Sequence, residues 1–197
     1  TQKMKTLAPE SVKFRMPPDA KLFQFKEGET IQSSLTSLVG DKIHLPFPVV
    51  ALEFYSNLGD DQVPTIIFAV EQEDDIAIEF GVKSEGKWQF IEDVIFYLNR
   101  QHYGVRAGRF SEQKEQDPQR VELIEWCGKT AYIAVAQLIC ALACSNVNIS
   151  DHSAKPSTLK QQMRKGKNKL PLYSYKTLTV KVGKNEDDVI TLDANED

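Results

Sequence analysis

The stretch Ala131–Cys144 (AYIAVAQLICALAC) places apolar or small side chains on every side of a helix, and Gln137 is its only strongly polar residue. A helix that is apolar all round has to be buried on all its faces. The stretch has fourteen residues, whereas a helix needs roughly 20 to cross a bilayer. The sequence therefore predicts a central core helix rather than a membrane span. A homodimer interface on one face of this helix is the alternative.

The start of this helix is marked by Asp117-Pro118, because Asp is a common N-cap and Pro suits the first helical position. We expect the helix to extend to about Cys144. Its first half is amphipathic, with charged residues such as Arg120 and Glu125 among apolar ones. The plainest structure for such a helix is a core element packed on a sheet.

Runs of β-branched and aromatic residues follow one another in the middle of the chain, separated by short polar connectors. This arrangement is typical of an antiparallel meander. The runs are Leu45–Tyr55 (LPFPVVALEFY), Thr65–Gln72 (TIIFAVEQ), Asp75–Val82 (DIAIEFGV) and Lys87–Leu98 (KWQFIEDVIFYL). The last run also fits helical spacing from Ile91 onward, so a helix there stays open.

A further strand is expected near the end of the chain, where Leu170–Val182 (LPLYSYKTLTVKV) alternates between two faces. It is expected to pair with Val189–Ala194 as a C-terminal hairpin. The predicted fold class is therefore α+β, with a mainly antiparallel sheet packed on one long buried helix.

The first thirty residues mix charge, proline and scattered apolar residues without a clean period. We expect residues 1–30 to form an irregular arm, with a short strand at Lys21–Phe25. Residues 31–197 then form a single domain of ordinary size. The domain opens with a short helix at Ile31–Val39, where apolar residues recur at helical spacing before Gly40.

Two segments are expected to lack regular structure. Residues 99–117 (NRQHYGVRAGRFSEQKEQD) are polar, contain glycine and show no period, which indicates a long loop of the mobile or functional kind. Ser145–Ser153 (SNVNISDHS) has the composition of a cap and turn.

The three cysteines, Cys127, Cys140 and Cys144, all lie in the predicted long helix. An odd, clustered set does not make a disulfide framework, and no further Cys or His stands at zinc-ligand spacing. We therefore expect reduced, buried cysteines in a cytoplasmic protein with no membrane association. The first ten residues, TQKMKTLAPE, contain no apolar signal-peptide core, which agrees with that location.

The sequence lacks the motifs of the common enzyme classes. It contains no G-x-S-x-G, no G-x-x-x-x-G-K-[ST], no G-x-G-x-x-G, no H-E-x-x-H and no C-x-x-C. The three histidines stand apart from one another: His44, His102 and His152. We expect no metal and no cofactor. His102 is the best candidate for a general base, because the polar loop around it also holds Tyr103 and two arginines.

Carboxylates gather on and beside the predicted meander, where a divalent-metal nuclease would place its ligands. They are Glu53, Glu71, Glu73, Asp74, Asp75 and Glu79. The closest match to the E-x-K element of such nucleases joins Glu79 to Lys83 and is two residues too long. Charged strand ends also discourage edge-to-edge pairing, which is the plainer interpretation. A metal-dependent nuclease or other hydrolase that uses these carboxylates with His102 is the alternative function.

Charge is strongly segregated along the chain. The protein has 24 Lys and Arg and 28 Asp and Glu, a formal net charge of -4. Residues 155–184, called the basic segment below, hold nine cations and no acid, whereas residues 185–197 hold six anions and no cation. The other 154 residues carry 15 cations and 22 anions. A basic segment on an acidic body favours a binding function.

The densest part of the basic segment is the candidate binding surface. Its cations would neutralise phosphates, and a tyrosine that follows them could stack on an unpaired base. Two arginines of the 99–117 loop are expected to join this surface. The candidate residues are Lys160, Arg164, Lys165, Lys167, Lys169, Tyr173, Arg106 and Arg109. An acidic protein is the other ligand considered, and in the plainest interpretation these cations solubilise a loop or pair with the acidic end of the chain.

Three elements of the sequence occur together. They are LPFPVVALEFY (Leu45–Tyr55), the apolar helix running into Cys144-Ser145-Asn146-Val147, and K-P-x-x-L-x(4)-R-K-G-K-x-x-L-P-L-Y-x-Y-x-x-L-T-V from Lys155 to Val180. Over about Leu45 to Val182 the chain resembles a group of small bacteriophage and prophage proteins of unassigned biochemical function. The resemblance implies a phage origin and action in the cytoplasm of an infected bacterium. It supplies no catalytic residues.

The leading expectation is a phage accessory protein of the host-interaction or anti-defence type. It would bind nucleic acid or a host protein that handles nucleic acid, without catalysis, and its acidic body could mimic nucleic acid toward a basic partner. A virion structural component is a further alternative beside the hydrolase.

Overall fold

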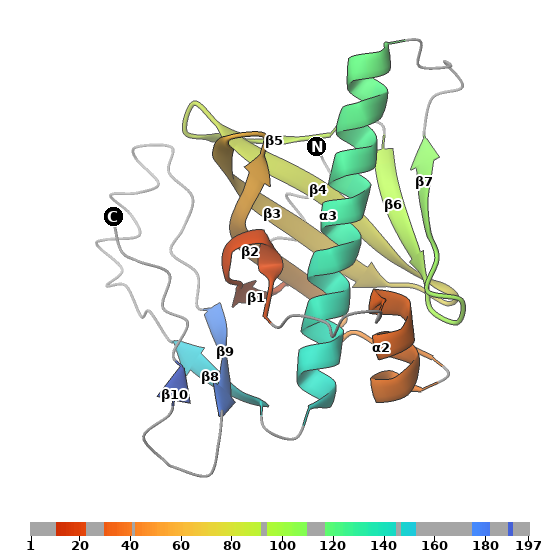
Figure 1. Ribbon diagram of the computed structural model, residues 1–197, viewed down its shortest axis with the longest axis vertical. Helices are drawn as coiled ribbons and strands as arrows, with labels where there is room; N and C mark the ends of the chain where they lie inside the picture. The colour runs from red at the N-terminus through yellow and green to blue at the C-terminus, as the bar shows by residue number, and fades with distance from the viewer. Residues whose placement is uncertain are drawn as a thin grey trace.

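The computed structural model describes residues 11–22, 30–40, 42–91, 94–109, 117–144, 147–152, 175–181 and 189–190. These residues form the predicted α+β fold, in which a mixed β-sheet packs against one long helix (Figure 1). A second, short helix lies beside the C-terminal half of the long one.

The helices are α2 (Ile31–Val39) and α3 (Pro118–Ala143), with a short 3-10 turn η1 (Pro18–Ala20). The strands are β1 (Val12–Arg15), β2 (Val49–Leu58), β3 (Asp61–Glu71), β4 (Asp75–Ser84), β5 (Lys87–Phe90), β6 (Val94–Asn99), β7 (Val105–Arg109), β8 (Val147–His152), β9 (Tyr175–Lys181) and β10 (Val189–Ile190). Their order across the sheet is β10-β9-β1-β2-β3-β4-β6-β7, with β5 beside β4 and β8 beside β9. Among these strands β1 runs parallel to β2 and β9, and the other pairings are antiparallel.

One face of the sheet packs against the helices and forms the main core. Alternate residues of the central strands face α3, among them Leu52, Phe80 and Phe96, and all three are buried. Gly128 lets α3 approach β6, because a Cβ at that position would lie 2.9 Å from Cε1 of Phe96. The opposite face of the sheet is called the outer face below.

The long helix begins and ends close to its predicted limits. Asp117 accepts a hydrogen bond from the backbone N–H of Gln119 at 3.0 Å, and Pro118 occupies the first helical position. By length and composition alone α3 could cross a membrane, since its most apolar 18-residue window has a mean hydropathy of 1.3. Because 61% of that window is buried inside the protein, α3 is packed as a core helix.

The one polar residue of the apolar stretch has a structural partner. Gln137 is buried, and its Oε1 accepts a hydrogen bond from the backbone N–H of Leu22 at 3.2 Å. All residues from Ala134 to Ala141 are already buried within the chain. The homodimer through helix 118–144 stays a prediction, and its contact would lie on the exposed first turns of α3, where Leu123 is 42% exposed.

The meander lies close to its predicted place, but its last run is two strands. β5 pairs with the end of β4, and β6 pairs with the start of β4, so that Phe96 stands opposite Ile78. The helix considered from Ile91 is therefore wrong. Apolar residues of β6 fit the spacing of a helix and also the alternation of a strand. The pairing of β6 with β4 makes this segment a strand.

Two segments predicted to be irregular contain strands. Val105–Arg109 (β7) pairs with β6, and Val147–His152 (β8) pairs with β9. β7 contains two arginines and a glycine, and four of the six residues of β8 are polar, so neither segment has the apolar content that marks a strand in the sequence. Neighbouring strands supply the hydrogen bonds that local propensity does not predict.

The N-terminal arm contributes a strand at a different place from the predicted one. β1 lies between β2 and β9, and its Phe14 is fully buried. Lys21 and Leu22 are not in a strand, and the rest of the predicted strand Lys21–Phe25 lies outside the described residues. A parallel strand needs a partner far away in sequence, so its position could not be predicted locally.

Part of the predicted C-terminal hairpin is described: β9 pairs antiparallel with β10, with Lys181 opposite Val189. The rest of Leu170–Val182 and of Val189–Ala194 lies outside the described residues. Two of the three cysteines, Cys127 and Cys140, are buried as predicted. Cys144, at the end of α3, is half-buried.

Candidate functional site

The predicted binding residues of the basic segment fall outside the part of the chain that the structure describes. They are Lys160, Arg164, Lys165, Lys167, Lys169 and Tyr173. The described end of the basic segment is strand β9, which pairs with β1, β8 and β10. The Nζ of Lys176 in β9 lies 5.5 Å from the centre of the Phe47 ring, a cation–π contact.

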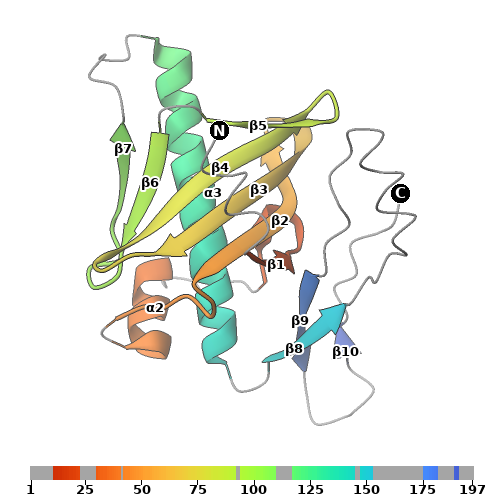
Figure 2. The same cartoon turned by 180° about the vertical axis from the view of Figure 1, so that it is seen from behind.

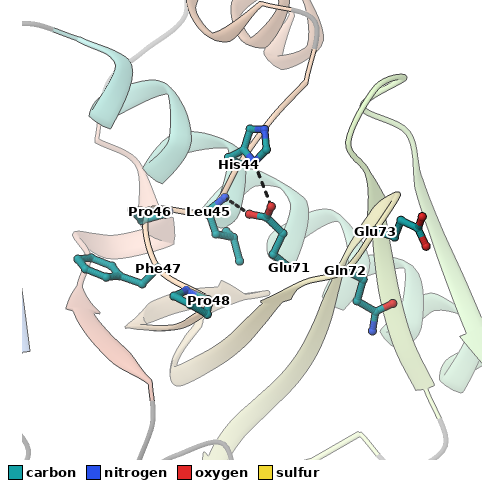
Figure 3. A pocket seen from close by; sticks show the side chains of 8 residues that line it. All are labelled: His44, Leu45, Pro46, Phe47, Pro48, Glu71, Gln72 and Glu73. Atoms are coloured by element: carbon teal, nitrogen blue, oxygen red, sulfur yellow. Dashed lines mark hydrogen bonds and ion pairs between the residues drawn. The ribbon is translucent and has the colours of Figure 1, made fainter.

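Phe47 belongs to the wall of an open hollow of about 530 Å³ between the start of β2 and the end of β3 (Figure 3). The hollow is lined by His44, Leu45, Pro46, Phe47, Pro48, Glu71, Gln72 and Glu73. In Figure 3, Glu71 points toward His44 and Leu45, whereas Glu73 points away from them. The hollow therefore has one internally bonded carboxylate and one directed outward.

Arg100, at the end of β6, is buried behind this hollow. Its Nε donates to the carbonyl of Ile43 at 2.9 Å, and its Nη1 donates to the carbonyls of Gln72 and Glu73 at 2.8 and 3.1 Å. Its Nη2 lies 2.5 Å from Oε1 of Glu71. These contacts join the segment before β2 to the β3–β4 turn.

His44 contacts the guanidinium group of Arg100. Its Nδ1 is 2.5 Å from Nη2 of Arg100 and 3.0 Å from Oε1 of Glu71. This nitrogen either accepts a hydrogen bond from Arg100 or, when it carries a proton, donates one to Glu71. Four of the five N–H groups of Arg100 have acceptors in Ile43, Gln72, Glu73 and Glu71. Arg100, Glu71 and His44, called the Arg100 clasp below, therefore connect protein segments, and nearly all donors of the arginine are used within the protein.

Glu71 is held as a carboxylate. Partial burial raises its pKa, but the hydrogen bond from the backbone N–H of Leu45, the bond with His44 and the charge of Arg100 together outweigh burial and lower the pKa below its ordinary value. Glu71 thus stabilises the clasp in its ionised form.

The carboxylates considered for a metal-dependent nuclease are not brought together. Glu71 stands opposite Ile76, in the set of residues facing α3, whereas Glu79 stands opposite Phe68 on the outer face. Strand residues of opposite parity lie on opposite sides of a sheet, so these two side chains do not share one metal ion. Within the described ranges, no group of three or more His, Cys, Asp or Glu side chains is arranged to hold a metal.

His102 occupies a turn between β6 and β7. Its backbone N–H donates to Oδ1 of Asn99 at 2.8 Å, and its carbonyl accepts from Nε2 of Gln32 at 3.3 Å. Tyr103 beside it is buried. The hydroxyl of Tyr103 donates to the carbonyl of Gly40, so this tyrosine is engaged within the fold.

Arg106 lies on β7 opposite Tyr97 of β6. Its guanidinium carbon is 4.4 Å from the centre of the Tyr97 ring, and its Nη2 is 2.6 Å from Oδ2 of Asp75. The side chain is 62% exposed, so of the predicted binding residues Arg106 is placed on the protein surface. Arg109 stands opposite Val94 on the same strand.

A second aromatic cluster lies on the outer face and was not predicted as a site. Phe68 and its neighbours Ala51 and Ile66 pack against Trp88 and Phe90 of β5. The Nζ of Lys83 lies 5.9 Å from the centre of the Trp88 ring. Alternation in β4 and the tryptophan of β5 are visible in the sequence, but the register that brings Lys83 opposite Trp88 is not.

No protein-family model, no curated protein and no solved structure matches the chain. The residues described above define the class of protein at the level of fold: an α+β protein with helices on one face of its sheet and cation–aromatic pairs on the other.

Proposed function

We propose that the protein binds nucleic acid, without catalysis of its own, as a bacteriophage accessory protein acting in the cytoplasm of the host. The observation that carries this proposal is the place of β9. This strand, the described part of the basic segment, pairs with β1 and so belongs to the sheet. Cations fixed at one end to a folded scaffold lose less freedom when they bind phosphates.

The distribution of charge supports the same proposal. The basic segment carries nine cations and no acid, whereas the rest of the chain has a negative net charge. A protein of net charge -4 that binds nucleic acid must do so through a locally basic surface, and the basic segment is where its cations gather. The phage context comes only from the sequence resemblance.

The hydrolase alternative has less support from geometry. Glu71 is engaged by the Arg100 clasp, and Glu79 lies across the sheet from it. His102, its proposed base, belongs to the β6–β7 turn, where its backbone is hydrogen-bonded to Asn99 and Gln32.

The proposal is tested by measuring affinity for labelled single-stranded and double-stranded DNA and RNA over a salt series. We expect log affinity to fall linearly with log salt concentration. Replacing Arg164, Lys165, Lys167 and Lys169 with Ala should reduce the magnitude of this slope by about 0.7–0.9 for each phosphate that the protein no longer neutralises.

The matched control removes the same number of cations elsewhere, with Lys21, Lys42, Arg120 and Lys129 changed to Ala. This variant has the same net charge and should keep the wild-type slope. An equal decrease of the slope in both variants, or no binding by the wild type at low salt, would contradict the proposal. Capture of a host protein in place of nucleic acid would assign the basic segment to a protein partner instead.

A further inference from the structure

We propose that the outer face of the sheet is a platform for single-stranded nucleic acid, on which unpaired bases stack at Tyr97 with Arg106 and at Trp88 with Lys83. The inference rests on the proposed function and names its ligand class. It also adds a surface that the basic segment does not include.

The outer face is open in the described part of the protein. Viewed from behind, β2, β3 and β4 face the viewer, with α3 on the far side, and no described helix crosses these strands (Figure 2). Sheets that are solvated on one face usually carry polar residues there. This face instead carries aromatic side chains, including Tyr55, which is 49% exposed.

The first stacking position is the Tyr97–Arg106 pair. Asp75 binds Nη2 of Arg106 at 2.6 Å and holds the guanidinium over the ring. Among the described residues, Nε and Nη1 of Arg106 have no hydrogen-bond partner, so these donors remain for a phosphate or a base edge. An arginine plane fixed in this way also offers a second flat surface for stacking.

The second position is the Trp88–Lys83 pair at the other end of β4. Tyr97 stands opposite Ala77, and Trp88 stands opposite Lys83. Lys83 lies six positions along β4 from Ala77, which is about 20 Å at the rise of an antiparallel strand. Phe68 and Phe90 lie between them on the same face. A strand of several nucleotides could therefore contact both pairs.

At the two positions the acidic side chains are paired with cations; between them Glu79 also lies on this face, and it takes part in an interaction of its own. Glu53 is paired with Lys13, and Asp75 is paired with Arg106. Lys83 adds a cation at the second pair. Tyr97 and Trp88 are half-buried, so each ring keeps part of its surface for a ligand. A duplex hides the flat surfaces of its bases, so such a platform selects unpaired strands.

The chain offers a direct reporter, because it contains two tryptophans, Trp88 and Trp126. Trp126 packs against Phe80 on the helix side of the sheet. In the variant Trp126→Phe, fluorescence comes from Trp88 alone. We expect an unstructured 12-nucleotide oligo-dT to quench this fluorescence, and a hairpin duplex at the same concentration to leave it unchanged. The variant Trp88→Phe, which keeps Trp126, should show no quenching.

Affinity supplies the second measurement. Tyr97→Leu and Trp88→Leu should each weaken oligo-dT binding by about 5- to 100-fold, because the base no longer stacks on an aromatic ring. Neither removes a charge, so the salt slope should stay as in the wild type. Arg106→Lys keeps the charge but removes the planar group, and it should weaken single-strand binding while the thermal midpoint stays close to that of the wild type.

Failure of this inference is separable from failure of the proposed function. Wild-type binding with unquenched Trp88, and with Tyr97→Leu as tight as the wild type, overturns the platform and leaves binding by the basic segment. Tighter binding of the duplex than of oligo-dT also overturns the platform. Absence of any binding at low salt overturns both.

Discussion

Nη2 of Arg100 and Oε1 of Glu71 lie 2.5 Å apart, which pairs a buried arginine at the end of β6 with the last residue of β3. The two residues are far apart in sequence, and the same guanidinium also binds three backbone carbonyls. The Arg100 clasp thus adds side-chain bonds where the chain enters β2, beside the backbone hydrogen bond from the N–H of Ile43 to the carbonyl of Arg100.

Removing the arginine should be strongly destabilising. Arg100→Ala leaves three carbonyls and the Glu71 carboxylate without their donor, and we expect the free energy of unfolding to fall by about 3 kcal/mol. Urea denaturation measures this decrease. The matched control is Arg106→Ala, whose ion pair with Asp75 is exposed and should contribute less than about 1 kcal/mol. Equal effects of the two substitutions would show that the clasp contributes no more than a surface ion pair.

The clasp should also make stability depend on pH. The pKa of Glu71 is lower in the folded protein than its ordinary value of 4.5, so the folded state favours the carboxylate. Its contribution is fully present above that ordinary value and is lost as pH falls through the folded pKa. The thermal midpoint of Glu71→Gln should therefore lie below that of the wild type near neutral pH, and the difference should shrink in acid. A constant difference across the pH range would contradict this assignment.

Packing on the outer face can be tested through Gly81. A Cβ at Gly81 would lie 2.2 Å from Cε1 of Phe90, whereas a Cβ at Gly104 would meet no atom within 4 Å. We expect Gly81→Ala to destabilise the protein by about 1–3 kcal/mol, because the Phe90 ring must move. Gly104→Ala should be nearly neutral. In the background Phe90→Ala, the cost of Gly81→Ala should fall, and thermal denaturation of the four proteins measures this coupling.

The thiols should differ in reactivity. Burial raises the pKa of Cys127 to about 12 and, together with the neighbouring Cys144, raises that of Cys140 to about 11. Because the thiolate is the reactive form, both should resist iodoacetamide in the folded protein near neutral pH. Cys144 is half-buried and should be modified first. Peptide mass spectrometry over a time course, with a urea-unfolded sample as control, gives the order, and early labelling of Cys127 would contradict it.

The sequence was most informative where one pattern sufficed. Asp117-Pro118 and the apolar stretch that follows determine α3 locally, and alternation indicates β4. Local sequence patterns did not predict β1 or β7. Both strands are short, and each is defined by its pairing with a neighbouring strand, β2 for β1 and β6 for β7. Long-range pairing, rather than intrinsic propensity, creates these strands.

The candidate sites show the same limit. Arg106 could be selected from the sequence as a cation in a polar loop, but its contact with Tyr97 depends on the β6–β7 register. His44 lies 27 residues from Glu71 and 56 from Arg100, so no spacing rule predicts their contact. The three residues meet because the segment before β2, the β3–β4 turn and the end of β6 lie side by side in the fold.

The position of β1 has a consequence for synthesis of the protein. Phe14 is paired on one side with Leu52, which the ribosome adds soon afterwards, and on the other with Lys176, which it adds much later. Contacts of such large sequence separation form slowly, and a nascent chain keeps one edge of β1 unpaired until β9 emerges. Pulse-labelled hydrogen exchange should find the amides at the β1–β9 boundary protected later than those between β2 and β3. The sheet is therefore assembled from its middle outward, and the strand that carries the basic segment is among the last to join it.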